Sequence, residues 1–406
     1  MRPPAGIYVH LPFCQRHCFY CSFPVSAGRR PAARQRYWSL LLREIDLWAA
    51  WWHGENSVAT DLGLPCPGWA EGRGQEGEGF VSLYLGGGTP TLYSGEELAG
   101  LIQTIRRLLP VEATAEIAVE ANPGTVTRPQ LQQLVAAGVN RLSLGVQARQ
   151  DDLLARLGRG HTSAQTEAAV EVAREAGVPS LNLDLMFGLP GQSLAQWEET
   201  LRWAVALRPD HLSCYSLIVE EETPLAGWLA SGRLPPLPSE DEGLAQYELA
   251  RQLLGEAGYV QYEISNFARP GQESRHNLLY WHYDNWLAFG VGAAAHWDSF
   301  RWRNLSDLLG YEAAMAAGQF PLAEVRPLTR HEQMEEMVLM GLRLREGVGE
   351  EEFRRRFGCS LHQVFGTALD RLETGGFVQW RPGGRLALTD KGLPVGNQVF
   401  TEFLLD

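Results

Sequence analysis

The chain has 406 residues, of which 45% are hydrophobic and 20% charged, a balance typical of a globular protein with a sizeable core. Its net charge of −13 and pI of about 5.3 argue against a general binder of phosphate backbones, so we expect no nucleic-acid partner. The chain has no apolar run long enough for a transmembrane helix, no signal-peptide core in "MRPPAGIYVH" and no disulfide-like spacing of its 6 cysteines, so we expect a cytoplasmic protein.

Short β-type runs alternate with helical patterns over the first two thirds of the chain. The runs are nearly continuous in apolar residues, as expected of strands covered on both faces. Strands are predicted at 6–11, 80–87, 116–122, 141–147, 180–189 and 211–219, and helices at 36–52, 95–109, 128–137, 163–176, 194–207 and 241–257. This repeated alternation predicts a parallel α/β sheet or barrel.

Two segments near the start have a distinct composition. Residues 54–79 are rich in glycine and acidic residues and lack periodicity, so we interpret them as a flexible, solvated insertion in which Cys66 is incidental. Just before it, "LWAAWWH" carries Trp48, Trp51 and Trp52. We interpret these rings as the buried face of a helix, with peripheral membrane contact as the alternative.

From about residue 320 the pattern changes to three helical segments, a hairpin-like run "FVQWRPGGRLALT" and a last helix. We therefore predict a core barrel over 1–300, a connection over 301–325 and a small winged-helix-like module over 326–406. Its Glu-rich helices favour a protein-docking or lid role over DNA binding. Cys359 in this module has no evident partner, and Cys214 on the sixth strand is expected in the core.

Polar residues follow the predicted strands at their carboxyl ends, where a parallel barrel places its chemistry. The turn "GGGT" fits neither G-x-G-x-x-G nor a P-loop, but its N–H groups could face a ligand carboxylate. Glu120 could accept hydrogen bonds from an ammonium group, Asp184 from ribose hydroxyls, and Arg159 could pair with a carboxylate. These groups suit a ligand with an amino-acid end and a nucleoside end. The alternative is a set of turns and hydrogen bonds at a barrel mouth.

The stretch "HLPFCQRHCFYCSFPVS" holds half of the cysteines, Cys14, Cys18 and Cys21, in the spacing C-x3-C-x2-C. A structural zinc site would need a fourth ligand, for which His17 or His10 is available. A four-iron cluster also takes cysteine thiolates, and with three of them one iron stays open to a small molecule.

The cysteine spacing followed by a glycine-rich turn resembles the radical S-adenosylmethionine (SAM) superfamily, over residues 6 to 300. The resemblance implies a partial (β/α)6 TIM-like barrel, a [4Fe-4S] cluster whose open iron binds SAM, and an electron donor such as a flavodoxin. In that family, reduction splits SAM into methionine and a 5′-deoxyadenosyl radical. The resemblance implies that the cluster is held by Cys14, Cys18 and Cys21, and SAM by Tyr8, Tyr20, Gly87, Gly88, Thr89, Glu120, Gln147, Arg159, Asp184 and Ser216.

Within the superfamily, "YVHLPFC", "YLGGGTPT", "LSLGVQ", "LGRGH" and "DLMFGLPGQ" are similar to the branch of oxygen-independent coproporphyrinogen III oxidase and the HemW heme chaperones. The oxidases carry a fourth cysteine two residues after the third, where this chain has Phe23, and a long extension before the motif. In addition, "RHNLLYWHYDNW" resembles the H-N-x-x-Y-W motif of the chaperones. This motif implies heme binding by His276, Asn277, Tyr280 and Trp281.

The chemistry of these residues suits a porphyrin. A neutral imidazole such as that of His276 is a good axial ligand for heme iron. Tyr280 and Trp281 offer flat apolar surface with polar edges, and Asn277 could orient the imidazole or bind a propionate. His282 and His296 are candidate second ligands. The alternative is that His276 is a structural histidine among aromatic rings.

We therefore predict a heme chaperone that binds heme and delivers it to an acceptor protein, with the cluster and SAM as its control element. No catalytic residue is assigned. One alternative is an oxidase that decarboxylates coproporphyrinogen III by radical chemistry. Another is a radical enzyme on a different substrate, with His276 as acid or base.

Overall fold

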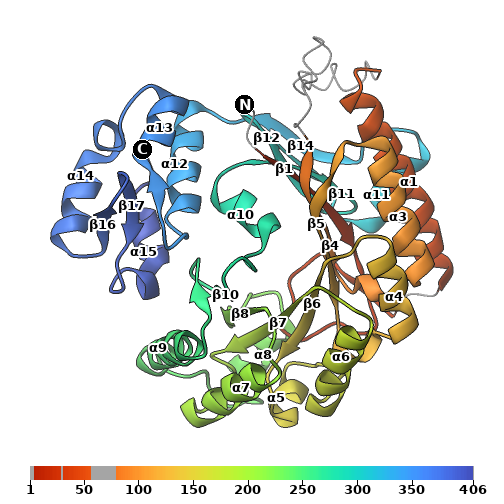
Figure 1. The fold of residues 1–406 in the computed structure, drawn as a ribbon, viewed down its shortest axis with the longest axis horizontal. Coiled ribbons are helices and arrows are strands. Elements are labelled where there is room, and N and C mark those ends of the chain that lie inside the picture. The colour runs from red at the N-terminus through yellow and green to blue at the C-terminus, as the bar shows by residue number, and fades with distance from the viewer. Residues whose placement is uncertain (1–3, 29–30, 56–78, 406) are drawn as a thin grey trace.

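The computed structural model describes residues 4–28, 31–55 and 79–405 (Figure 1). Most of the predicted insertion over 54–79, including Cys66, lies outside these residues. Among the described residues, no helix is long and apolar enough to cross a membrane.

Six parallel strands form the middle of a large sheet, in the order in which they occur in the chain. They are β1 (Ala5–Leu11), β4 (Phe80–Gly87), β5 (Val111–Ala121), β6 (Arg141–Gln147), β7 (Ser180–Phe187) and β8 (His211–Ser216). Each strand pairs in parallel with the next. The six predicted strands are thus confirmed, and their carboxyl ends lie along one rim of the sheet.

Helices cover the outer face of this curved sheet (Figure 1). The six predicted ones are α1 (Pro31–Trp52), α3 (Gly95–Leu108), α4 (Arg128–Ala136), α6 (Ser163–Glu175), α7 (Leu194–Ala206) and α9 (Glu240–Glu256). Two short helices, α5 (Asp151–Arg156) and α8 (Pro224–Ala230), were not predicted. Several helices begin with a capping box, as at α3, where Ser94 and Glu97 bond each other's backbone N–H.

The sheet continues beyond the six strands on both sides. Next to β8 lie β10 (Asn266–Ala268) and β9 (Val260–Gln261). Next to β1 lie β11 (Asn285–Phe289), β12 (Ala294–Trp297), β13 (Phe300–Asn304) and β14 (Leu322–Pro327), with α11 (Leu308–Ala316) between the last two. The described sheet runs from β14 to β9 without closing, so the barrel is partial. The segment predicted as a connection therefore contributes two strands to the sheet.

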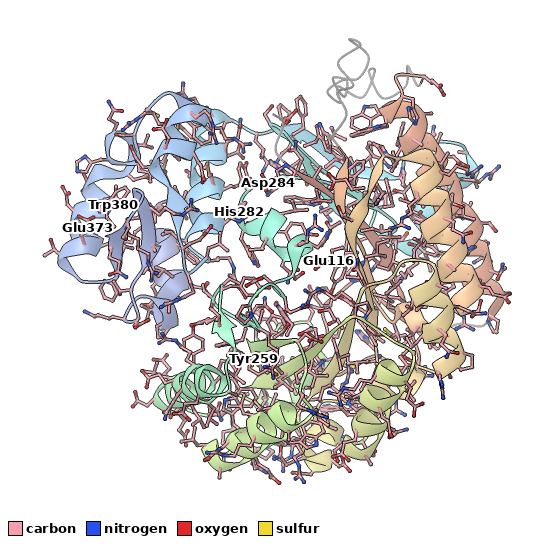
Figure 2. The ribbon with its side chains drawn as sticks, viewed as in Figure 1. Glu116, Tyr259, His282, Asp284, Glu373 and Trp380 are labelled. Atoms are coloured by element: carbon pink, nitrogen blue, oxygen red, sulfur yellow. The ribbon has the colours of Figure 1, made fainter. Side chains whose placement is uncertain are left out.

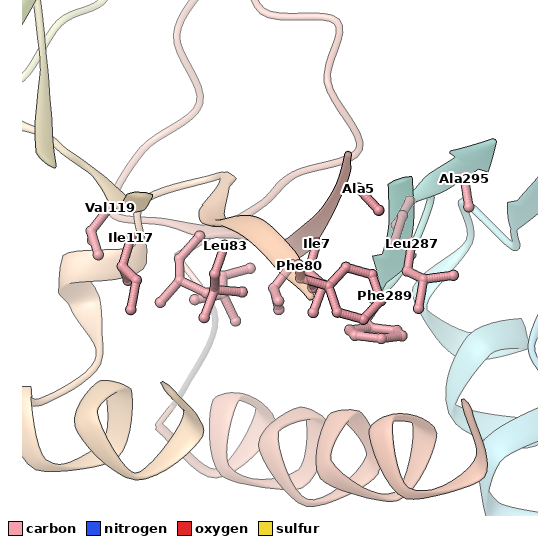
Figure 3. Packing of buried hydrophobic residues seen from close by; sticks show 14 of the residues in the cluster. Ala5, Ile7, Phe80, Leu83, Ile117, Val119, Leu287, Phe289 and Ala295 are labelled. Carbon is pink, nitrogen blue, oxygen red and sulfur yellow. The ribbon is translucent and has the colours of Figure 1, made fainter. Parts of the chain in front are cut away.

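The main core lies between the sheet and the helices α1 and α3, as Figure 3 shows for Ile7, Leu83 and Ile117. Trp48 of α1 is fully buried, and its ring stacks on Trp302 of β13 with centroids 5.1 Å apart. Trp51 and Trp52 are buried beside it. The predicted apolar face of α1 is confirmed, and because these rings are enclosed they offer no surface for membrane contact.

A buried carboxyl group ties α1 to the far end of the sheet. Glu44 accepts hydrogen bonds from the Gly290 amide (2.8 Å), from Asn304 Nδ2 (2.6 Å) and from the Tyr311 hydroxyl (2.6 Å). Burial raises the pKa of Glu44 from its ordinary 4.5 to about 7, although these donors oppose the shift.

This raised pKa predicts a pH-dependent stability. Between about pH 4.5 and 7 the native state binds more protons at Glu44 than the unfolded chain. The contribution of Glu44 to the free energy of unfolding is therefore complete below that range and is lost as the pH rises through it. We expect the free energy of unfolding of the wild type to fall as the pH rises through this range. For Glu44→Gln we expect the fall to be smaller, by on the order of 1–3 kcal/mol. Urea denaturation at pH 5 and pH 8 measures this difference, and parallel pH profiles would contradict it.

The C-terminal segment forms a separate group of elements on one side of the barrel (Figure 1). It contains α12 (Arg330–Gly341), α13 (Glu350–Phe357), α14 (Leu361–Thr374), α15 (Gly396–Thr401) and a small sheet of β15 (Val348–Gly349), β17 (Arg385–Leu388) and β16 (Val378–Arg381). The predicted helices and hairpin are present, and the module contacts α10 (Arg275–Trp281) through α12. The boundaries given above for the domains stay a prediction.

Candidate functional site

The carboxyl ends of the parallel strands and the cysteine loop enclose a cavity of about 420 Å³, a size suited to a small molecule. The loop starts at β2 (Phe13–Cys14), which pairs in parallel with β3 (Ser26–Ala27). The predicted residues that line the cavity are Cys14, Cys18, Tyr20, Cys21, Gly87, Gly88, Thr89, Glu120, Gln147, Arg159 and Asp184. Tyr8 and Ser216 are not among the lining residues, so their contact with SAM stays a prediction.

The glycine-rich turn is fixed against the cysteine loop. Gly87 has a φ of 105°, and a Cβ there would lie 2.3 Å from the His10 ring. The amides of Gly88 and Thr89 donate to the carbonyls of Leu11 and Phe13, and that of Gly87 donates to Glu120. The idea that these N–H groups face a ligand carboxylate is therefore wrong for this structure, because the fold already uses them.

The three loop cysteines are partly buried and line the same cavity. Burial raises the pKa of Cys14 to about 11, although a hydrogen bond from Thr89 Oγ1 to its Sγ (3.7 Å) opposes the shift. His10, one of the suggested zinc ligands, has both ring nitrogens engaged, by Tyr8 and by the Pro24 carbonyl. His17 bonds the Cys21 carbonyl through Nε2. Three cysteines without His10 suit a cluster with three protein ligands better than a zinc site, which needs four. Among the described residues, no group of three or more His, Cys, Asp or Glu side chains is arranged to hold a metal ion as the structure stands.

Arg159 is a buried cation on the wall of the cavity, which Arg16 also lines. Its guanidinium donates to Cys18 Sγ (3.5 Å), to Asn122 Oδ1 and to the Gly145 carbonyl. Its Nε is buried without a hydrogen-bond partner among the described residues. A buried donor left unpaired is costly, so a ligand group that reached this atom would supply the missing hydrogen bond.

Two carboxyl groups lie on the cavity wall. Glu120 accepts from the Tyr84 hydroxyl (2.8 Å) as well as from Gly87, and burial raises its pKa to about 7. Asp184 accepts from Ser143 Oγ (2.9 Å) and Asn182 Nδ2 (2.8 Å), and burial raises its pKa as well. The structure thus brings the two carboxyl groups and Arg159 to one cavity. Their contacts with a molecule that carries an ammonium group, a carboxylate and hydroxyls stay a prediction.

Sequence reasoning missed several residues that line the cavity, among them Tyr84, Ser143, Gly145, His161, Met186 and Tyr215. Tyr84 and Ser143 stand inside their strands, where the nearly continuous apolar pattern hides which side chains point inward. Gln147 has a φ of 69° beside a register shift between β6 and β7, a strain that only the structure reveals.

The helix α10, which carries the H-N-x-x-Y-W motif, packs against the barrel strands through a close approach at Gly6. A Cβ on Gly6 would lie 2.6 Å from Leu279 and 3.2 Å from His276 Nδ1. The helix begins at a buried ion pair, in which Arg141 Nε donates to Glu116 Oε2 at 2.8 Å. Figure 2 shows Glu116 beside α10.

Glu116 and Arg141 both hold the start of α10. Glu116 accepts from the amide of Arg275 (3.1 Å) and that of His276 (3.0 Å). Arg141 Nη2 donates to the carbonyls of Gln272 (2.7 Å) and Glu273 (3.0 Å). The position of the motif is therefore set by β5 and β6, whose other ends line the cysteine cavity.

His276 is almost fully buried, and both of its ring nitrogens are engaged. Nδ1 shares a hydrogen bond with Ser82 Oγ (2.8 Å), and Nε2 shares one with the Tyr280 hydroxyl (2.7 Å). The ring stacks on Tyr84 with centroids 5.0 Å apart. Burial lowers its pKa to about 4, so the imidazole is neutral. Ligation of iron by His276 would require Tyr280 to turn away.

The other motif residues are less enclosed. Asn277, Tyr280 and Trp281 are partly exposed on one side of α10. The Tyr280 ring meets Trp286 edge-on with centroids 4.6 Å apart, and the Arg343 guanidinium lies 4.4 Å from the centre of the Trp281 ring. Of the candidate second ligands, His282 is exposed and lies 3.9 Å from Glu346, whereas His296 is fully buried.

Comparisons with known proteins agree on one group. The model of the Radical SAM superfamily matches residues 70–204, and that of the HemN C-terminal domain matches residues 328–395. The chain is 37% identical to "Heme chaperone HemW" of Bacillus subtilis (strain 168) over 98% of both chains. It is 39% identical to the protein of that name from Escherichia coli (strain K12), over 72% of this chain and 70% of the relative.

A solved structure shows the same fold. The protein described as "Coproporphyrinogen III oxidase (HemN) from Escherichia coli is a Radical SAM enzyme" superposes with a TM-score of 0.81 at 25% identity. The superposition covers 99% of this chain and 90% of that one. The partial barrel and the C-terminal module are therefore arranged here as in that structure, which confirms the predicted fold class.

Proposed function

The chain belongs to the radical SAM superfamily and, within it, to the heme chaperone HemW family, and from this premise we propose that it binds heme and delivers it to an acceptor protein. The observation that carries the proposal is the similarity to heme chaperones along the full length of the chain, at 37% identity over 98% of both sequences. The motif helix α10 supplies aromatic residues that suit the cargo, because Tyr280 and Trp281 are partly exposed residues, although the Arg343 guanidinium lies over the Trp281 ring.

The superfamily implies a [4Fe-4S] cluster and SAM, and the residues of the cavity fit both. Cys14, Cys18 and Cys21 would hold the cluster, and the free Nε of Arg159 would pair with the carboxylate of SAM. Glu120 would accept from its ammonium group. When bound, the cluster and SAM supply one-electron reductive chemistry.

In this proposal the cavity is the control element and α10 is the cargo element. The two are neighbours, because Tyr84 bonds Glu120 in the cavity with its hydroxyl and stacks its ring on His276. The acceptor protein, an electron donor such as a flavodoxin, and a cytoplasmic location belong to the proposal as partners and setting.

The second candidate is the oxidative decarboxylation of coproporphyrinogen III. The superposition on the solved oxidase and the matching cavity favour it. Phe23 disfavours it, because phenylalanine stands where the oxidases have their fourth cysteine and offers no thiol. The Phe23 side chain is 66% exposed and lines the cavity. A role for His276 as acid or base in another radical enzyme is disfavoured as well, because this residue is buried away from the cavity lining.

An anaerobic turnover assay separates the two candidates. Reconstituted protein with SAM and a chemical reductant is given coproporphyrinogen III, with the Escherichia coli oxidase as positive control, and the products are separated by chromatography. In parallel, hemin is added and its Soret band recorded. We expect no protoporphyrinogen above the background without protein, together with a shifted Soret band. Protoporphyrinogen formation at the rate of the control would support the oxidase instead.

A further inference from the structure

One side chain contacts both the cysteine cavity and the motif helix α10. Tyr84 of β4 lines the cavity, and its hydroxyl donates to Glu120 Oε1 at 2.8 Å. The ring of the same tyrosine stacks on the imidazole of His276, with centroids 5.0 Å apart and 23° between the planes. Tyr84 therefore touches both the carboxyl group proposed to take the ammonium group of SAM and the first residue of the H-N-x-x-Y-W motif.

The strand that carries Tyr84 is itself bonded at both places. Ser82, which lies two residues before Tyr84 and on the same face of β4, shares a hydrogen bond of 2.8 Å with His276 Nδ1. Gly87, at the end of β4, donates its amide to Glu120 Oε2 at 3.0 Å. One short stretch of β4 thus holds the motif histidine at one end and the cavity carboxyl at the other.

A second tyrosine packs on this contact. The ring of Tyr8 lies 6.1 Å from that of Tyr84 and 6.5 Å from that of His276, between centroids. His10 Nε2 donates to the Pro24 carbonyl (3.2 Å), so its Nδ1 accepts from the Tyr8 hydroxyl (2.9 Å). The three stacked rings are therefore fixed to the cysteine loop as well as to β4.

The charge of Glu120 also acts on α10. Burial and the nearby Glu120 carboxylate raise the pKa of Tyr280, whose hydroxyl shares a hydrogen bond of 2.7 Å with His276 Nε2. Burial raises the pKa of Glu120 itself to about 7, so part of it is protonated near neutral pH. An ammonium group beside Glu120 favours the carboxylate, and a charged acceptor makes a stronger hydrogen bond with Tyr84 than a neutral one. A ligand of this kind therefore tightens the hold on the ring that supports His276.

We propose that Tyr84 is a positioning residue that couples occupancy of the cavity to the order of α10, so that a bound amino-acid ligand such as SAM stabilises the motif helix. This inference rests on the proposed function, because it names the residue through which the proposed control element acts on the proposed cargo element. Because coupled binding is reciprocal, SAM and heme then each raise the affinity for the other.

Hydrogen–deuterium exchange of the anaerobically reconstituted full-length protein, followed by mass spectrometry, tests the coupling at α10. Exchange of the peptide spanning 275–284 is compared with and without saturating SAM, whose occupancy is measured by equilibrium dialysis. In the wild type we expect SAM to slow this exchange at least about fivefold. In Tyr84→Phe, which keeps the ring but lacks the hydroxyl, we expect no slowing at the same SAM occupancy. The helix α9 is the internal reference for a general stabilisation by the ligand.

The matched control is Tyr259→Phe. The Tyr259 hydroxyl donates to the Pro209 carbonyl at 2.6 Å, and Figure 2 shows this residue near α9, outside the cavity lining. The control loses a tyrosine hydrogen bond without touching the link, so SAM should slow the exchange of α10 as in the wild type. If SAM does not slow this exchange in the wild type, or slows it equally in Tyr84→Phe, the inference is overturned.

A hemin titration of the same proteins separates the inference from the proposed function. In the wild type we expect SAM to lower the heme dissociation constant at least about fivefold, and in Tyr84→Phe to leave it nearly unchanged. A wild type that binds no heme would overturn the proposed function and the effect on heme, while the exchange data still decide whether Tyr84 couples the cavity to α10. Equal heme affinity with and without SAM would overturn the inference and leave the proposed function standing.

If Tyr84→Phe takes up no SAM, the contact is removed from the other side. His276→Ala deletes the ring on which Tyr84 stacks, although His276 is not part of the cavity lining. We expect this variant to bind SAM about fivefold more weakly than the wild type, and His276→Phe, which keeps a ring there, to recover part of the loss. Equal SAM affinity of the wild type and His276→Ala would overturn the inference.

Discussion

Replacing Cys18 by alanine is expected to abolish the iron–sulfur chromophore of the anaerobically reconstituted protein. Cys18 lines the cavity with Cys14 and Cys21, and its Sγ accepts a hydrogen bond from Arg159. With one thiolate removed, a second iron of the cluster loses its protein ligand. Iron and sulfide content and the visible absorbance measure this loss, which we expect to be nearly complete.

Cys359→Ala is the matched control for this prediction. Cys359 is also partly exposed but lies in the C-terminal module, where its Sγ is 3.9 Å from Arg330. We expect the control to keep the cluster content of the wild type. A Cys18→Ala protein that retains its iron, or an equal loss in both variants, would contradict the assignment of the cluster to the cysteine loop.

The second large effect is expected at the start of α10. Arg141→Leu leaves the Glu116 carboxylate buried without its cation, with only 6% of the side chain exposed, and removes two bonds to the carbonyls before the helix. Removal of one partner from a buried ion pair typically costs about 3–5 kcal/mol. We expect a decrease of that size in the free energy of unfolding, measured by urea denaturation, and weaker heme binding because α10 loses its support.

The control for this prediction is Arg149→Leu, which breaks an ion pair with Glu199 whose side chains are 41% and 48% exposed. An exposed pair contributes at most about 1 kcal/mol, so its loss should be small. The double variant Glu116→Gln with Arg141→Leu should recover part of the stability, since no charge is then left buried. Equal losses for Arg141→Leu and Arg149→Leu would show that the buried pair does not hold the helix.

The middle of the fold could be predicted from the sequence because its strands are continuous apolar runs and its helices have regular apolar faces. The outer strands β12 and β13 were not predicted, because each is only 4 or 5 residues long and the alternation in "FRWRN" is too short to mark a strand by itself. These strands are stabilised by contacts with α1, such as Trp302 on Trp48, which join residues far apart in the chain. Local patterns carry no trace of such contacts.

The cavity residues could be predicted where a polar side chain follows a strand, as with Glu120 and Arg159. The hydrogen bonding of a histidine could not be predicted, because it depends on partners that are distant in the sequence. His276 is bonded by Ser82, which lies 194 positions earlier in the chain, and His296, between two flanking rings, bonds the Asp284 carbonyl. The sequence therefore singled out the residues of α10 but could not show which histidine nitrogens in this region are already hydrogen-bonded.

The measurement that tests the central claim most directly is an equilibrium titration of the reconstituted wild-type protein with hemin, without oxygen and in the presence of SAM. We expect a shifted Soret band that saturates at about one heme per chain, with a dissociation constant in the micromolar range or below, since a carrier must hold its cargo at cellular concentrations. A spectrum that stays that of free hemin, or an absorbance that rises without saturation, would contradict the claim that this chain carries heme.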